Sequence, residues 1–85
     1  MKLIASKVIQ KHINSWDPEY LLAGGAPEDE YEREIEEIVD AVLDSRDEIE
    51  IAEAIKNIFD YSFGRDFHFD ECLSVAKKIW NELYE

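Results

Sequence analysis

The chain has 85 residues, of which 46% are apolar and 35% charged, and its formal net charge is −12. This length and composition predict one globular domain over residues 1–85 and argue against a disordered chain. The negative charge argues against binding to nucleic acids, which are held largely by lysine and arginine, and against binding to an anionic membrane surface.

The first helix is predicted over residues 3–14, where apolar side chains recur at helical spacing. Its buried stripe is expected to contain Ala5, Ile9, Ile13 and Trp16, widened by Ile4, Val8 and His12. Asn14 and Ser15 are expected to end it. Two lysines four residues apart, Lys7 and Lys11, then share its outer face.

A short capped corner helix is predicted over residues 18–22. Asp17 is a favourable N-cap residue, and Pro18 suits the first helical position. Trp16 then precedes the cap and Leu21 follows at the fourth helical position, which is the spacing of a hydrophobic staple. We therefore interpret the Trp-Asp-Pro motif first as a structural device that redirects the chain.

The glycine pair Gly24–Gly25 is expected to end the corner helix, because glycine adopts the left-handed conformation at little cost. Pro27 then begins a longer helix to about Asp44. Acidic residues fill its first turn, where the helix dipole favours negative charge. Its buried stripe is predicted to contain Tyr31, Ile35, Ile38 and Val42, with Val39 and Leu43 beside it, and its other positions are mostly acidic.

The third helix is predicted from Glu48 to about Phe63. Asp47 and Glu50 have the spacing of a capping box, and Gly64 supplies the stop. The buried stripe should contain Ile51, Ala52, Ile55, Ile58, Phe59 and Ser62.

Residues 65–68 read as a loop, and the last helix is predicted from Phe69 to Tyr84. Its inner face should contain Cys72, Leu73, Ala76, Ile79, Trp80 and Leu83. Among the aromatic residues, Phe67 and Tyr84 are expected to be partly exposed. Four helices with short connections predict an all-α fold, a small antiparallel bundle with the capped corner helix at one end.

The sequence offers few groups for chemistry. His68 and Cys72 lie four residues apart, but a structural zinc site needs four ligands of this kind, and His12 is the only other histidine. We expect His68 or Asp66 to cap the last helix and Cys72 to pack as a small apolar residue. No catalytic residue, metal ligand or cofactor is predicted.

The cellular location is predicted from the single cysteine, Cys72, which excludes an intrachain disulfide. A small domain without a disulfide suggests a reducing compartment. We expect no signal peptide, because charge returns at Lys7, and no apolar run reaches the roughly 18 residues needed to span a bilayer. The predicted location is the cytoplasm.

Three short motifs carry a resemblance to a known family: Trp16-Asp17-Pro18, Gly25-Ala26-Pro27 and Asp29-Glu30-Tyr31. With them, nearly the whole chain resembles a family of small bacterial proteins, mostly from the bacillus group, that is catalogued as a domain of unknown function and sometimes called YugE-like. The resemblance implies a helical, soluble, cytoplasmic protein and carries no known activity. A looser resemblance links the Trp-Asp-Pro and Asp-Glu-Tyr motifs to small proteins suspected of being immunity proteins against secreted toxins.

The functional hypothesis rests on charge asymmetry. Residues 28–50 contain twelve acids and two arginines, whereas residues 1–14 contain lysines and no acid. Such a field favours a basic protein partner, so we expect a non-enzymatic, acidic protein-binding module that acts as an immunity-like protein, inhibitor or adaptor. The residues expected to contact the partner are Tyr20, Tyr31, Glu34, Glu37, Asp40 and Asp44.

Three alternatives stay open. The acids could form only a solvated face that aids solubility. The chain could be a self-associating structural protein in which the basic first helix meets the acidic helix of another copy, with a monomer or weak homo-oligomer in solution. It could also be a small enzyme or metal-binding protein that uses the region from His68 to Cys72.

Overall fold

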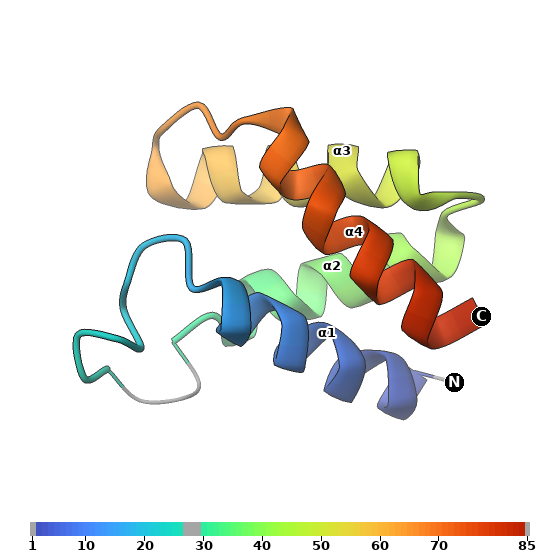
Figure 1. Ribbon diagram of the computed structural model, residues 1–85, viewed down its shortest axis with the longest axis horizontal. Helices are drawn as coiled ribbons and strands as arrows, with labels where there is room; N and C mark the ends of the chain where they lie inside the picture. Colours follow the sequence, from blue (N-terminus) through green and yellow to red (C-terminus); the bar gives the residue numbers. More distant parts are fainter. Residues whose placement is uncertain (1, 27–29, 85) are drawn as a thin grey trace.

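The computed structural model describes residues 2–26 and 30–84, which form four helices (Figure 1). They are α1 (Lys2–Trp16), α2 (Glu32–Asp44), α3 (Glu48–Phe63) and α4 (Phe69–Tyr84). Helix α1 packs against α2 and α4, and α3 packs against the same two helices. Figure 1 shows α1 and α3 running towards one end of the molecule and α2 and α4 towards the other. The predicted all-α fold is therefore confirmed.

The core lies where the apolar stripes of the four helices meet. Its largest fully buried side chains include Ile9, Ile13, Tyr31, Ile38, Ile51, Ile55, Phe59 and Ile79, all of which were predicted to face inward. Burial of such stripes is the main stabilising contribution in a domain of this size, because short helices alone are marginal in water. No helix in the described ranges is long and apolar enough to cross a membrane.

Two burial predictions are wrong. Ile4 is 61% exposed, because it lies beside the buried stripe that Ala5 occupies. Leu43, which was expected beside the stripe of α2, is 40% exposed. Phe67, in contrast, is only 2% exposed. Its N–H donates to the Asp60 carboxylate at 2.7 Å, which holds the loop against α3. Tyr84 is partly exposed, as predicted.

The predicted bounds of α3 and α4 are confirmed, and Asp47 accepts a hydrogen bond from the Glu50 N–H at 3.0 Å. The Glu50 carboxylate accepts from the N–H of Arg46, one residue before the partner that a capping box would use. At the other end of α3, Gly64 adopts the left-handed conformation, with φ 64°.

The two remaining helix bounds differ from the prediction. Helix α1 continues to Trp16, past the expected end at Asn14–Ser15. Helix α2 begins at Glu32, with Tyr31 as its N-cap residue. The predicted start at Pro27, with Glu28 and Asp29 in the first turn, lies outside the described residues.

The predicted corner helix over residues 18–22 is wrong, because the chain forms consecutive turns there. The N–H of Gly25 donates to the Leu22 carbonyl at 3.0 Å, and that of Ala26 donates to the Leu21 carbonyl at 2.9 Å. Together with φ 98° at Gly25, these bonds form the Schellman pattern that closes a helical turn. The predicted stop at Gly24–Gly25 is thus confirmed.

Candidate functional site

The loop between α1 and α2 is held by a buried pair, Asp17 and Tyr31. The Tyr31 hydroxyl donates to Asp17 Oδ1 at 2.6 Å and accepts from the N–H of Glu19 at 3.2 Å. The Asp17 carboxylate also accepts from the N–H groups of Leu22 and Ala23, at 3.2 and 2.9 Å. One carboxylate therefore ties the start of the loop to its middle and to its end. We call this pair the loop anchor.

The loop anchor shifts the acidity of both its members. Burial alone would raise the pKa of Asp17, but the hydrogen bonds from Tyr31, Ala23 and Leu22 outweigh it, so the pKa lies below its ordinary value. Burial and the hydrogen bond to the carboxylate raise the pKa of Tyr31 to about 12. The anchor is thus a carboxylate bound to a neutral phenol at neutral pH. Its polar atoms face one another, so its role is to hold the loop.

Among the described residues of this loop, Asp17 and Tyr20 have left-handed backbone conformations without being glycine, with φ 43° and φ 56°. Aspartate tolerates this region, because its short side chain bonds to nearby backbone groups, as Asp17 does here. Tyr20 has no such compensation, and its side chain is 76% exposed. The left-handed backbone of Tyr20 is therefore strained, and burial of its side chain does not compensate for this strain, because the side chain is exposed.

The acidic side chains fall into two groups. Some form ion pairs that join elements: Glu19 pairs with Arg65 at 2.7 Å, and Lys56 bridges Asp60 and Asp66 at 2.7 and 2.6 Å. These pairs support the turn between α3 and α4 and the loop that precedes α2.

The other group lies on the outer side of α2, where Glu36, Glu37 and Asp44 are exposed. None of these three forms an ion pair within the described part of the chain. With the exposed Asp40 they make up the α2 acidic face, defined here as Glu36, Glu37, Asp40 and Asp44. A groove of about 310 Å³ runs between α1 and α2 beside it, lined by Ser6, Glu36, Val39 and Asp40.

The structure divides the six residues that the sequence predicted as partner contacts. Glu37, Asp40, Asp44 and Tyr20 are exposed, and their role in binding stays a prediction. Tyr31, in contrast, is fully buried in the loop anchor rather than exposed at the surface.

Glu34 is only 6% exposed, so its carboxylate does not lie at the surface as those of Glu37 and Asp44 do. Its carboxylate accepts from the Ser62 hydroxyl at 3.0 Å and lies 3.7 Å from Arg33 Nε. The side chain of Glu34 therefore connects α2 to α3. The sequence did not reveal that it points inward, because other acidic residues lie around it at helical spacing.

The region from His68 to Cys72 gives little support to an enzyme or metal site. Cys72 is fully buried, and burial together with the nearby Asp60 carboxylate raises the pKa of its thiol to about 11. His68 is exposed, and its carbonyl accepts the N–H of Cys72 at 3.3 Å. No group of three or more histidine, cysteine, aspartate or glutamate side chains among the described residues could hold a metal ion.

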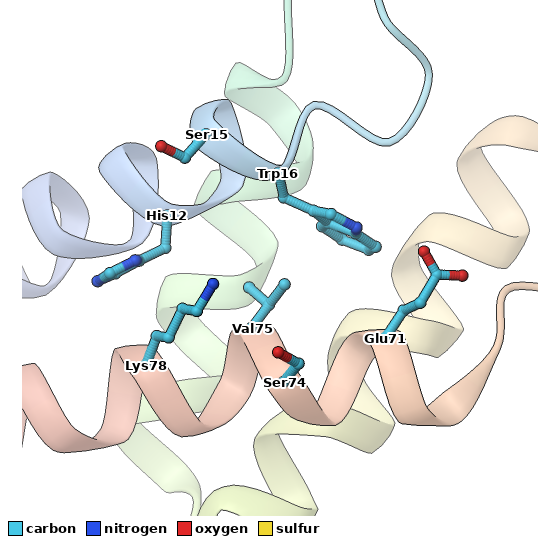
Figure 2. Close-up of a pocket in the computed structure, with 7 residues that line it drawn as sticks. All are labelled: His12, Ser15, Trp16, Glu71, Ser74, Val75 and Lys78. Atoms are coloured by element: carbon cyan, nitrogen blue, oxygen red, sulfur yellow. The ribbon is translucent and has the colours of Figure 1, made fainter.

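A second concave site, which sequence reasoning missed, lies between α1 and α4 (Figure 2). It has a volume of about 400 Å³ and is lined by His12, Ser15, Trp16, Glu71, Val75 and Lys78, together with Ser74. The spacing of these residues, three to four apart on each helix, puts them on one face of α1 and one face of α4. That spacing could have revealed the site, had the pairing of α1 with α4 been known. We call it the α1–α4 groove.

A polar bridge between α1 and α4 includes His12, which also lines the α1–α4 groove. The Glu82 carboxylate accepts from Lys11 Nζ at 2.6 Å and lies 2.9 Å from His12 Nε2. The hydrogen bonds from Lys11 and His12 lower the pKa of Glu82. His12 is thus both a wall of the groove and part of the contact that holds α1 to α4.

Comparison with known proteins gives one result about family. Neither the curated proteins nor the solved structures gave a match to this chain. A family model described as "Domain of unknown function (DUF1871)" matches residues 7–81, a range that includes the loop anchor, the α2 acidic face and most of the residues that form the four helices. The chain therefore belongs to the family of domains of unknown function DUF1871.

Proposed function

We propose that this chain is a non-enzymatic protein-binding module that docks a basic protein partner through the α2 acidic face. It acts as a monomer or weak homo-oligomer in the cytoplasm, as an immunity-like protein, inhibitor or adaptor. The observation that carries the proposal is the exposure of Glu36, Glu37 and Asp44 without ion pairs in the described structure. The same negative field disfavours nucleic acids and anionic membranes as partners.

The energetics of α2 support this proposal. Asp44 lies in the last turn of the helix, where the dipole favours cations, and that turn contains no basic residue. Glu36, Glu37 and Asp44 are exposed and form no ion pair in the described chain. The negative charge of Asp44 therefore does not stabilise α2, and a role in binding accounts for it better than a role in folding.

The second candidate function, a solvated face that only aids solubility, predicts no dependence on where the charges lie. Solubility depends on the overall charge, whereas docking depends on the position of each carboxylate. Variants of equal net charge can therefore separate the two functions.

The experiment uses two single variants, Glu37→Lys on α2 and Glu53→Lys on α3. Both residues are exposed glutamates in a helix interior without an ion pair in the described chain, so the variants change the net charge equally. Wild type and both variants are immobilised, and proteins retained from host lysate at low and moderate salt are identified and then purified.

The proposal predicts one basic protein that wild type and Glu53→Lys retain alike. Glu37→Lys should bind this purified protein about tenfold more weakly at low salt, because the reversed charge removes an attraction and adds a repulsion. Equal affinity for the two variants, or no saturable binding of any purified basic protein, would reject docking through α2.

A further inference from the structure

The α1–α4 groove has a second feature that is independent of the acidic face: it is apolar in the middle and oppositely charged at its two ends. Figure 2 shows the side chain of Lys78 rising from α4 towards α1 and that of Glu71 rising beyond the far edge of the Trp16 indole, with Trp16 and Val75 between them. Glu71 and Lys78 are seven residues apart, which places them about 10 Å apart along the helix axis.

The middle of the groove is lined by an aromatic ring, that of Trp16, and by the apolar side chain of Val75. The Trp16 ring packs on the core, with its centroid 5.2 Å from that of Phe59 and 5.9 Å from that of Phe67. Val75, which is 5% exposed, lies below it on α4. Trp16 is thus fixed from the core side, while the groove side of the residue stays available for a planar ligand to contact.

The two ends of the groove hold charged side chains that have no ionic partner in the described chain. Neither Lys78 nor Glu71 forms an ion pair in the described chain, although Lys56, Arg65 and other cations do. The volume of about 400 Å³ is at the lower end of the range for small-molecule sites. A ligand with one charge would pair with only one end of the groove, whereas a ligand with two opposite charges could pair with both ends.

We propose that the α1–α4 groove binds a small aromatic zwitterion, with its carboxylate at Lys78, its ring between Trp16 and Val75, and its ammonium group at Glu71. The order of the charges along α4 sets the orientation of the ligand. A site of this kind is half-open, so its affinity should be modest and should depend on both ends.

The chain provides matched controls for each end. Lys77 precedes Lys78 and Asp70 precedes Glu71, and both neighbours are exposed on the same helix without lining the groove. The two tryptophans serve as internal reporters, because Trp16 lines the groove whereas Trp80 contacts Tyr84 in a tilted arrangement, with 4.5 Å between ring centroids.

The experiment titrates the protein with para-(aminomethyl)benzoate and follows both indole N–H signals by proton–nitrogen correlation NMR. The Trp16 signal should shift saturably, and the Trp80 signal should stay in place. Para-toluate and para-methylbenzylamine, which each lack one charge, should bind about three- to fivefold more weakly, as expected for loss of one exposed ion pair.

The variants Lys78→Glu and Glu71→Lys should weaken binding at least as much, whereas Lys77→Glu and Asp70→Lys should leave it unchanged. All four residues are exposed, so each variant should retain the fold, which the unchanged dispersion of the spectrum would verify. Absence of a saturable shift at Trp16 overturns the proposal. So does equal binding of the three compounds, or an equal loss in the control variants.

Discussion

The loop anchor and the α2 acidic face both contain carboxylates, but these differ in burial and in hydrogen bonding. In the anchor, the Asp17 carboxylate accepts three hydrogen bonds and Tyr31 is fully buried. On the acidic face, Glu36, Glu37 and Asp44 project into solvent and form no ion pair within the residues described.

The difference teaches which polar residues the fold requires. A buried carboxylate must be hydrogen-bonded, so its partners are part of the structure, and losing one of them is costly. An exposed carboxylate near the C-terminal end of a helix brings no such stabilisation. Substitutions in the anchor should therefore lower the free energy of unfolding, whereas substitutions on the acidic face should change it little. Affinity for the partner should instead depend on the acidic face more than on the anchor.

The largest expected effect is that of Tyr31→Ala. The ring stacks on Phe59 with 6.0 Å between centroids, so the substitution leaves a cavity in the core and removes a hydrogen bond from Asp17. We expect the free energy of unfolding to fall by about 4 kcal/mol, measured by urea denaturation with circular dichroism. Tyr20→Ala is the control and should change it little. A loss below about 1 kcal/mol for Tyr31→Ala would contradict the anchor.

The second effect is smaller and depends on pH. Tyr31→Phe keeps the ring and removes the hydroxyl, which should lower the free energy of unfolding by about 1.5 kcal/mol at neutral pH. The pKa of Tyr31 is raised to about 12 in the folded chain, so its contribution is fully present below the unfolded value near 10 and is lost as pH rises towards 12.

The stability difference between wild type and Tyr31→Phe should accordingly shrink in that alkaline range. Lys56, whose pKa is also raised by its hydrogen bonds to Asp60 and Asp66, is present in both proteins, so its effect cancels in the difference. A difference that stays constant from pH 9 to 12 would show that the hydroxyl is not held as described.

Tyr20→Gly tests the backbone strain at Tyr20, whose exposed side chain does not compensate for the left-handed conformation. Glycine adopts φ 56° without the clash that a side chain causes, so the free energy of unfolding should rise by about 1 kcal/mol. Thermal and urea unfolding measure the change. Stability below that of wild type would mean that the exposed ring contributes to the fold after all.

The smallest effect is expected for Asp44→Asn, which removes a negative charge from the last turn of α2. Because a negative charge in the last turn interacts unfavourably with the helix dipole, its removal should raise the free energy of unfolding by about 0.5 kcal/mol. This increase should shrink with added salt. The equivalent change Glu53→Gln on α3 is the control. A loss of stability in Asp44→Asn would place the acidic face among the structural elements.

Local signals in the sequence predicted most of the helices because each signal acts within one or two turns. Asp47 and Gly64 mark the ends of α3, and the structure confirms their roles at both positions. The corner was wrong because Asp17 caps a turn further along the chain, through the N–H groups of Leu22 and Ala23, and its geometry depends on Tyr31, fourteen residues away. Periodicity cannot show such a contact.

The candidate sites were predictable only in part, for the same reason. Charge counting identified the acidic segment and correctly placed Glu37 and Asp44 on the surface. It could not distinguish them from Glu34, whose inward direction depends on Ser62 of α3. The α1–α4 groove escaped prediction because it exists only where two helices from opposite ends of the sequence lie side by side.

The measurement that tests the central claim most directly is the affinity of the purified basic partner for Glu37→Lys and for Glu53→Lys, with the free energy of unfolding measured on the same samples. We predict binding about tenfold weaker for Glu37→Lys than for Glu53→Lys, with both variants within about 0.5 kcal/mol of the wild-type stability. Equal affinities in two equally stable variants would contradict a binding role for the α2 acidic face.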